Sequence, residues 1–226
     1  MPKKTGRFFV ITVKRKGRSP VFDFSVGSII AKVIIILIAL PLHEFAHAAV
    51  AFKLGDNTAR DEGRLSVNPI RHLDPLGTIL LMVAGFGWAK PVPVNPWHFK
   101  NRKQGMMLVS LAGPLSNLSL AVLAVIVLGF LKPSGNTLFI FYNFIYINVL
   151  LAVFNFLPIP PLDGSKILAG ILPGRQQWLY QLEQYGTPIL FLLIFLGILS
   201  PVLRFFIDPI MNLLNLLAML VAGFSS

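Results

Sequence analysis

The sequence contains no cysteine and few charged residues. Because the 226-residue chain has no thiol, disulfide bonds and zinc sites built on thiolates are excluded. Charged residues make up 13% of the chain, whereas soluble globular proteins average about 25%. The hydrophobic share is 55% and the mean hydropathy is +0.73. The composition therefore predicts an integral membrane protein.

Acidic residues are especially scarce, with nine against twenty lysines and arginines, so the formal net charge is +11. The basic residues lie between apolar stretches and form no stripe with stacking aromatics. We therefore interpret them as groups that flank a lipid bilayer, and we expect no nucleic-acid partner. Residues 1–25 form a basic N-terminal arm, and residues 26–226 are expected to form a single transmembrane domain. The apolar piece at 8–13 is too short for the core of a signal peptide.

Long apolar runs predict an all-α, polytopic membrane fold with about five transmembrane helices. Residues 76–99 do not fit a spanning helix, because only about nine are continuously apolar and three prolines follow within six positions. We expect a re-entrant, partly extended segment there, between the first two spanning helices. Residues 165–185 are expected to form an amphipathic connector. The expected spans are 27–54, 105–131, 137–157, 187–203 and 205–223.

The charges leave the membrane orientation open. Both the N-terminal arm and the loop at 53–104 are basic, and each would be placed in the cytosol by the positive-inside rule. A single spanning helix cannot put both on the same side. Either the arm is held on the other face or the first span does not cross fully. The oligomeric state is also left open.

Two histidines and a glutamate interrupt the first apolar run, as His43-Glu44-Phe45-Ala46-His47. Each ionisable group at membrane depth costs roughly 2.5–3.5 kcal/mol, so three together indicate a functional site. Spacing of i, i+4 places His43 and His47 on one helix face, where both can ligate zinc. Glu44 lies beside them as a base for a water whose pKa zinc lowers.

A catalytic zinc usually has a third protein ligand. The remaining histidines, His72 and His98, lie in the proline-rich polar loop. Asp163 is the better candidate, because it ends a span and precedes Gly164 in a stretch that breaks the helix. Its alternative role is to cap the helix that follows. Beside a two-histidine pair that lacks a carboxylate ligand, metal ligation is favoured.

The two motifs together resemble the site-2 protease family, the zinc intramembrane metalloproteases of peptidase family M50. That family pairs H-E-x-x-H with N-x-x-P-x-P-x-L-D-G in another helix. The resemblance covers about residues 27–223 and points to the small prokaryotic branch, which has no PDZ or CBS domain. The second motif is matched here at Asn155, Pro158, Pro160, Leu162, Asp163 and Gly164.

The resemblance implies that His43, His47 and Asp163 bind one zinc ion per chain and that Glu44 is the general base. Asn155 would position the substrate or the oxyanion through its amide. Its alternative role is to satisfy backbone groups that the two prolines leave unpaired.

The activity implied is zinc-dependent endoproteolysis within the membrane. The substrate would be a transmembrane segment of another protein, and the enzyme a multi-pass protein of a prokaryotic cell membrane. Residues 76–96 could offer an edge to the unwound substrate, or could only plug the bundle. Two alternative functions remain: a catalytically silent relative that binds membrane proteins, or a metal or ion transporter that uses the same ligands.

Overall fold

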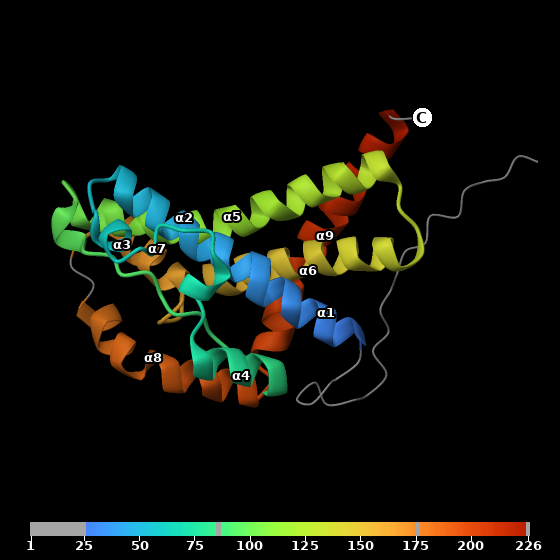
Figure 1. The fold of residues 1–226 in the computed structure, drawn as a ribbon. Helices are drawn as coiled ribbons and strands as arrows, with labels where there is room; N and C mark the ends of the chain where they lie inside the picture. Colours follow the sequence, from blue (N-terminus) through green and yellow to red (C-terminus); the bar gives the residue numbers. More distant parts are fainter. Residues whose placement is uncertain (1–25, 85–86, 175–176, 225–226) are drawn as a thin grey trace, which may run out of the picture.

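The first apolar run folds as one continuous helical rod. The computed structural model describes residues 26–84, 87–174 and 177–224 (Figure 1), so the basic arm at 1–25 lies outside the described residues. The rod comprises α1 (Val26–Ile34), the π-helical turn η2 (Ile35–Ala39) and α2 (Leu40–Lys53). Pro41 has no N–H to donate, and the Leu40 N–H bonds to the Ile35 carbonyl five residues back. The proline therefore accounts for the π turn in mid-helix.

The polar loop that follows contains four short elements. They are α3 (Thr58–Asp61), η3 (Pro69–Arg71), α4 (Pro75–Ala84) and η4 (Pro96–His98). Asparagine or aspartate side chains cap three of their N-termini: Asn68 accepts from Ile70 N, Asp74 from Gly77 N and Asn95 from Trp97 N. These caps, together with the prolines, explain why the loop breaks into short pieces.

The re-entrant segment is confirmed as one short helix followed by extended chain. Helix α4 has ten residues, and among the described residues from Gly87 to Asn95 the chain is not helical. Ala89 forms an isolated antiparallel bridge with Leu73. The Lys32 ammonium, buried in the first span, donates to the Met82 carbonyl in the last turn of α4 at 2.8 Å. That contact ties the re-entrant helix to the membrane-spanning rod.

Five further helices complete the described fold. They are α5 (Arg102–Leu131), α6 (Gly135–Phe156), α7 (Asp163–Ile171), α8 (Gln177–Phe195) and α9 (Leu199–Phe224). Helices α5, α6 and α9 pack together around a core that includes Val125, Val149 and Ile207. Helix α2 packs against α5 at the other end of the bundle (Figure 1). The all-helical fold class is therefore confirmed.

The boundaries of the last spans differ from the expectation. A single span was expected at 187–203, but the chain breaks at Gly197, whose φ is +71°. Glycine adopts this left-handed conformation without steric cost. Residues 177–185 belong to α8 rather than to a connector, and Asp208-Pro209 lies inside α9.

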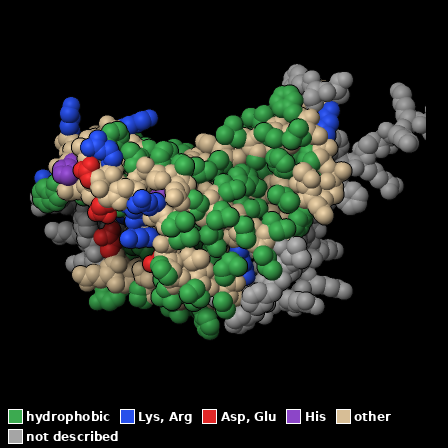
Figure 2. Space-filling view, in the orientation of Figure 1, with side chains coloured by type: hydrophobic (Ala, Val, Ile, Leu, Met, Phe, Trp, Pro, Cys, Tyr) green, Lys and Arg blue, Asp and Glu red, His purple; other side chains and the backbone are tan. Residues whose placement is uncertain are grey.

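Four described helices are long and apolar enough to cross a bilayer: Lys32–Lys53, Arg102–Leu131, Gly135–Phe156 and Leu199–Gly223. The apolar part of α8, Leu182–Phe195, is shorter. Figure 2 shows hydrophobic side chains over most of the bundle, with acidic, basic and histidine side chains gathered mainly at the end where α3 lies. The chain is a multi-pass integral membrane protein, and the expected five spans correspond to these four long helices and α8.

Candidate metal centre

His43 and His47 lie one turn apart on α2 and are both buried. Each ring is fixed through its Nδ1 atom. The His43 Nδ1–H donates to Asn117 Oδ1 on α5 at 2.7 Å, and the His47 Nδ1–H donates to the Val109 carbonyl on α5 at 2.7 Å. Since each proton is on Nδ1, both Nε2 atoms present lone pairs to the same space, which is the arrangement seen in histidines that ligate metals.

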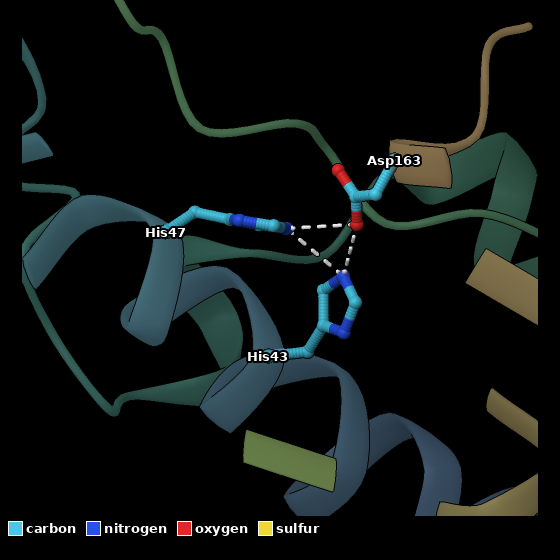
Figure 3. Close-up of side chains that lie close together, drawn as sticks. All are labelled: His43, His47 and Asp163. Carbon is cyan, nitrogen blue, oxygen red and sulfur yellow. Dashed lines mark hydrogen bonds and ion pairs between the residues drawn. The ribbon is translucent and has the colours of Figure 1, made fainter. Parts of the chain in front are cut away.

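Asp163 completes the group from the first turn of α7 (Figure 3). Its Oδ2 atom lies 3.2 Å from both His43 Nε2 and His47 Nε2, and the two Nε2 atoms are 3.0 Å apart. The alternative role as a helix cap is not observed. Leu162 occupies the N-cap position of α7 without a capping side-chain bond, and Asp163 is the first helical residue.

The three atoms fit a zinc ion. Two nitrogen lone pairs and a carboxylate oxygen face one another with no hydrogen-bond donor between them. A bound cation would offset the repulsion among these three electron-rich atoms. Zinc bonds of about 2.0–2.1 Å in a tetrahedron imply ligand separations of about 3.3 Å, and the observed separations are 3.0–3.2 Å. His43, His47 and Asp163 can therefore hold one metal ion.

Gly113 on α5 lies directly against this space. A Cβ atom there would be 2.5 Å from His43 Cε1, His43 Nε2 and His47 Nε2. Gly164 has a similar role beside Asp163, because its Cβ would meet the Phe156 and Leu157 carbonyls at 2.3 Å. Glycine at both positions lets α5 approach α2 and lets α7 approach the end of α6, which brings the ligands together.

Two buried asparagines, Asn117 and Asn148, form a chain of hydrogen bonds behind the His43 ring, here called the amide relay. Asn117 donates through Nδ2 to the Ala39 carbonyl at 3.3 Å and to Asn148 Oδ1 on α6 at 3.0 Å. Asn148 in turn donates to the Phe144 carbonyl at 2.9 Å, and both asparagines are fully buried. These bonds orient Asn117 with its oxygen toward His43. Sequence reasoning missed the role of Asn117, although an asparagine in an apolar helix was the available signal.

Glu44 does not join the three ligands. Its Oε2 atom accepts a hydrogen bond from the Val92 N–H at 3.0 Å, in the extended segment after α4. The re-entrant segment therefore lies against the predicted general base. Glu44 is half-buried, and among the described residues no hydrogen bond is formed by its second carboxylate oxygen.

Asn155 lies in the last turn of α6, eight residues before Asp163. Its Nδ2 donates to the Leu151 carbonyl of its own helix at 3.0 Å. Among the described residues, no hydrogen bond joins it to the three ligands or to Glu44. Its predicted role in positioning substrate stays a prediction.

The other two histidines stabilise the polar loop. His72 is fully buried and donates through Nε2 to the Ser66 carbonyl at 2.6 Å. His98 donates through Nδ1 to Asp56 Oδ1 at 2.8 Å, and Asp56 Oδ2 accepts from Asn95 N at 2.7 Å. Burial alone would raise the pKa of Asp56, but the hydrogen bonds from Thr58, His98 and Asn95 outweigh it and lower the pKa below its usual value.

Known proteins resemble the chain over most of its length. The sequence model of "Peptidase family M50" matches residues 132–197. The "Putative zinc metalloprotease YwhC" of Bacillus subtilis is 42% identical over 190 residues, which is 80% of this chain and 85% of the relative. The "Putative zinc metalloprotease MJ0611" of Methanocaldococcus jannaschii is 33% identical over 149 residues, 65% of this chain and 73% of the relative.

A mycobacterial protein is also similar to the chain. The "Putative zinc metalloprotease Rip2" of Mycobacterium tuberculosis H37Rv is 35% identical over 166 residues, 70% of this chain and 63% of the relative. No solved structure matches the chain significantly. The zinc named for these relatives agrees with the donor set of His43, His47 and Asp163. The chain belongs to peptidase family M50.

Proposed function

We propose that this protein is a zinc-dependent endopeptidase that cleaves a peptide bond within a transmembrane segment of another membrane protein. One observation carries the proposal. Three ligand atoms for a single metal ion lie within 3.2 Å of one another inside a helical bundle, and Glu44 directly follows the ligand His43 on α2. Two of the ligands lie on a helix apolar enough to span the bilayer. A peptide bond that reaches such a site would be held at membrane depth.

Each residue has a chemical task in this proposal. His43, His47 and Asp163 would hold zinc, which when bound lowers the pKa of a water toward neutrality and polarises the scissile carbonyl. Glu44 would take the proton from that water and pass it to the leaving amine. Asn155 would orient the substrate carbonyl through its amide.

The extended segment supports the proposal from the substrate side. A helical substrate must unwind to expose its peptide bond, and its freed backbone groups then need partners. The chain at 87–95 is not helical, forms a β-bridge at Ala89 and contacts Glu44 through Val92. A substrate strand that pairs with this segment would pass the general base.

The decisive experiment compares wild-type protein with Glu44→Gln. Membranes from host cells that express either form are analysed by mass spectrometry of newly formed protein termini. We expect fragments cut inside transmembrane segments only with the wild type. Identical fragments from both forms would reject the proposed proteolysis and leave the silent relative as the better interpretation.

Metal analysis tests the ligands independently. Asp163→Ala is expected to reduce the zinc content of the purified protein, whereas Glu44→Gln retains zinc because Glu44 is not a ligand. Undiminished zinc in Asp163→Ala would reject Asp163 as a ligand. Zinc flux through vesicles that persists in Glu44→Gln, without any cleavage by the wild type, would favour a transporter.

A further inference from the structure

The loop at 64–73, here called the clamp loop, holds the extended segment from one side. The Lys90 N–H donates to the His72 carbonyl at 2.8 Å, and Leu73 bridges Ala89. The Arg64 Nη2 atom donates to the Lys90 carbonyl at 2.6 Å and to the Pro91 carbonyl at 3.3 Å. Backbone and side-chain bonds together therefore fix residues 89–91 against the clamp loop.

Arg64 is an unusual residue to find in this place. Its side chain is buried, with 5% of the residue exposed. Within the part of the chain that the structure describes, it has no acidic partner, and its Nε atom has no hydrogen-bond partner. A buried cation bound only to carbonyls is costly. Backbone hydrogen bonds alone could hold residues 89–91 in place. We therefore expect the buried Arg64 guanidinium to have a more specific role.

The role follows from the geometry of one peptide group. Pro91 C=O and Val92 N–H belong to the same planar unit, and in the trans form they point in opposite directions. The only cis peptide among the described residues is at Pro160-Pro161. Arg64 binds the oxygen of the Pro91–Val92 unit, and Glu44 binds its N–H at 3.0 Å. The peptide therefore lies between a cation and a carboxylate.

This arrangement couples the two side chains. A donor on the carbonyl oxygen polarises the peptide and strengthens the hydrogen bond that its N–H makes. Pro91 fixes only its own φ, and the Pro91–Val92 unit still turns about ψ of Pro91 and φ of Val92, so its orientation depends on the hydrogen bonds from Arg64 and to Glu44. Removing the Arg64 contact would let the Pro91 carbonyl turn, and the Val92 N–H would then no longer be held toward Glu44.

We propose that Arg64 is a positioning residue for Glu44 and acts through the Pro91–Val92 peptide group. Among the described residues, no hydrogen bond or ion pair joins Arg64 to His43, His47 or Asp163. It fixes the N–H that holds one oxygen of the Glu44 carboxylate, which leaves the other oxygen directed for proton transfer. The proposal rests on the proposed function, because it takes Glu44 to be the general base.

Hydrogen–deuterium exchange on the full chain tests the coupling without any substrate. Peptides that cover 88–95 are compared in wild type, Arg64→Gln, Glu44→Ala and Glu44→Gln. We expect exchange in this segment to rise about tenfold or more in Arg64→Gln and Glu44→Ala. It should stay slow in Glu44→Gln, because a glutamine oxygen still accepts from Val92.

Arg71→Gln is the matched control, because Arg71 lies in the same loop and is exposed. It should leave exchange at 88–95 unchanged. Wild-type exchange in Arg64→Gln would overturn the proposal. Loss of protection in α5 as well would give Arg64 a role in folding only, and would overturn it equally.

Kinetics separate positioning from substrate binding. A fluorogenic peptide that spans a bond found in the Glu44 comparison serves as the probe. Arg64→Gln should lower kcat about 10- to 100-fold with KM within about twofold. A raised KM at unchanged kcat would overturn the proposal. Cleavage of the peptide by Glu44→Gln would instead reject the proposed function, whatever the hydrogen–deuterium exchange shows.

Discussion

Gly113→Ala should weaken zinc binding strongly while leaving the fold intact. The added Cβ would lie 2.5 Å from three ring atoms of His43 and His47, whereas ordinary contacts begin at about 3.4 Å. The rings would have to retreat by about 1 Å, but zinc sites tolerate ligand displacements of only about 0.2 Å. Each ring is also held at Nδ1 by a 2.7 Å hydrogen bond to α5.

The expected loss of zinc affinity is at least about 100-fold, or about 2.7 kcal/mol. Helix stability by itself should not suffer, because alanine is favoured over glycine in a helix interior by about 1 kcal/mol. Zinc affinity is measured by chelator competition and metal analysis, and the fold by circular dichroism and thermal unfolding of the metal-free protein.

Gly129→Ala is the matched control for Gly113→Ala. It lies on the same helix, and its Cβ would meet Val221 on α9 at 2.7 Å, far along the chain from the ligands. This variant should lose stability but keep zinc. Wild-type zinc affinity in Gly113→Ala would refute the inference that α5 packs directly against the metal space.

Two further predictions concern the supporting hydrogen bonds. Asn117→Ala should weaken zinc binding about 10- to 100-fold, because it frees the His43 ring. Chelator competition measures the loss. Unchanged zinc affinity would contradict the role of the amide relay. Asp56 has a lowered pKa, so its carboxylate contributes stability that is fully present above its unfolded pKa of about 3.9 and is lost as the pH falls below it. Thermal unfolding of metal-free protein should therefore show Asp56→Asn less stable than wild type at pH 6, with the difference shrinking below about pH 4; a constant difference would contradict this assignment.

Much of the site could be predicted from residue types and spacing. His43 and His47 are one helical turn apart wherever that segment is helical, because the helix repeat places i and i+4 on one face. Asp163 was identifiable because it ends an apolar span in a stretch that prolines break. The re-entrant segment was also predictable, since prolines at 91, 93 and 96 cannot continue a helix.

The exact ends of the last two helices were harder to predict. The expected spans at 187–203 and 205–223 placed a break at residue 204, but α9 runs through that position from Leu199 to Phe224. Gly197 ends the preceding segment instead, because its positive φ turns the chain. An apolar run holds several possible break points, and the packing of α8 and α9 on the rest of the bundle selects among them.

The sequence by itself determined the membrane class, the helical architecture and the ionisable groups that can bind metal. Those properties depend on composition and on local periodicity, which neighbouring residues along the chain decide. Only the tertiary structure placed Gly113 against the imidazoles, Asn117 behind His43 and the Pro91–Val92 peptide between Arg64 and Glu44. The reason is physical: each contact joins residues 27 to 74 positions apart, so it exists only once the helices and the re-entrant segment have packed.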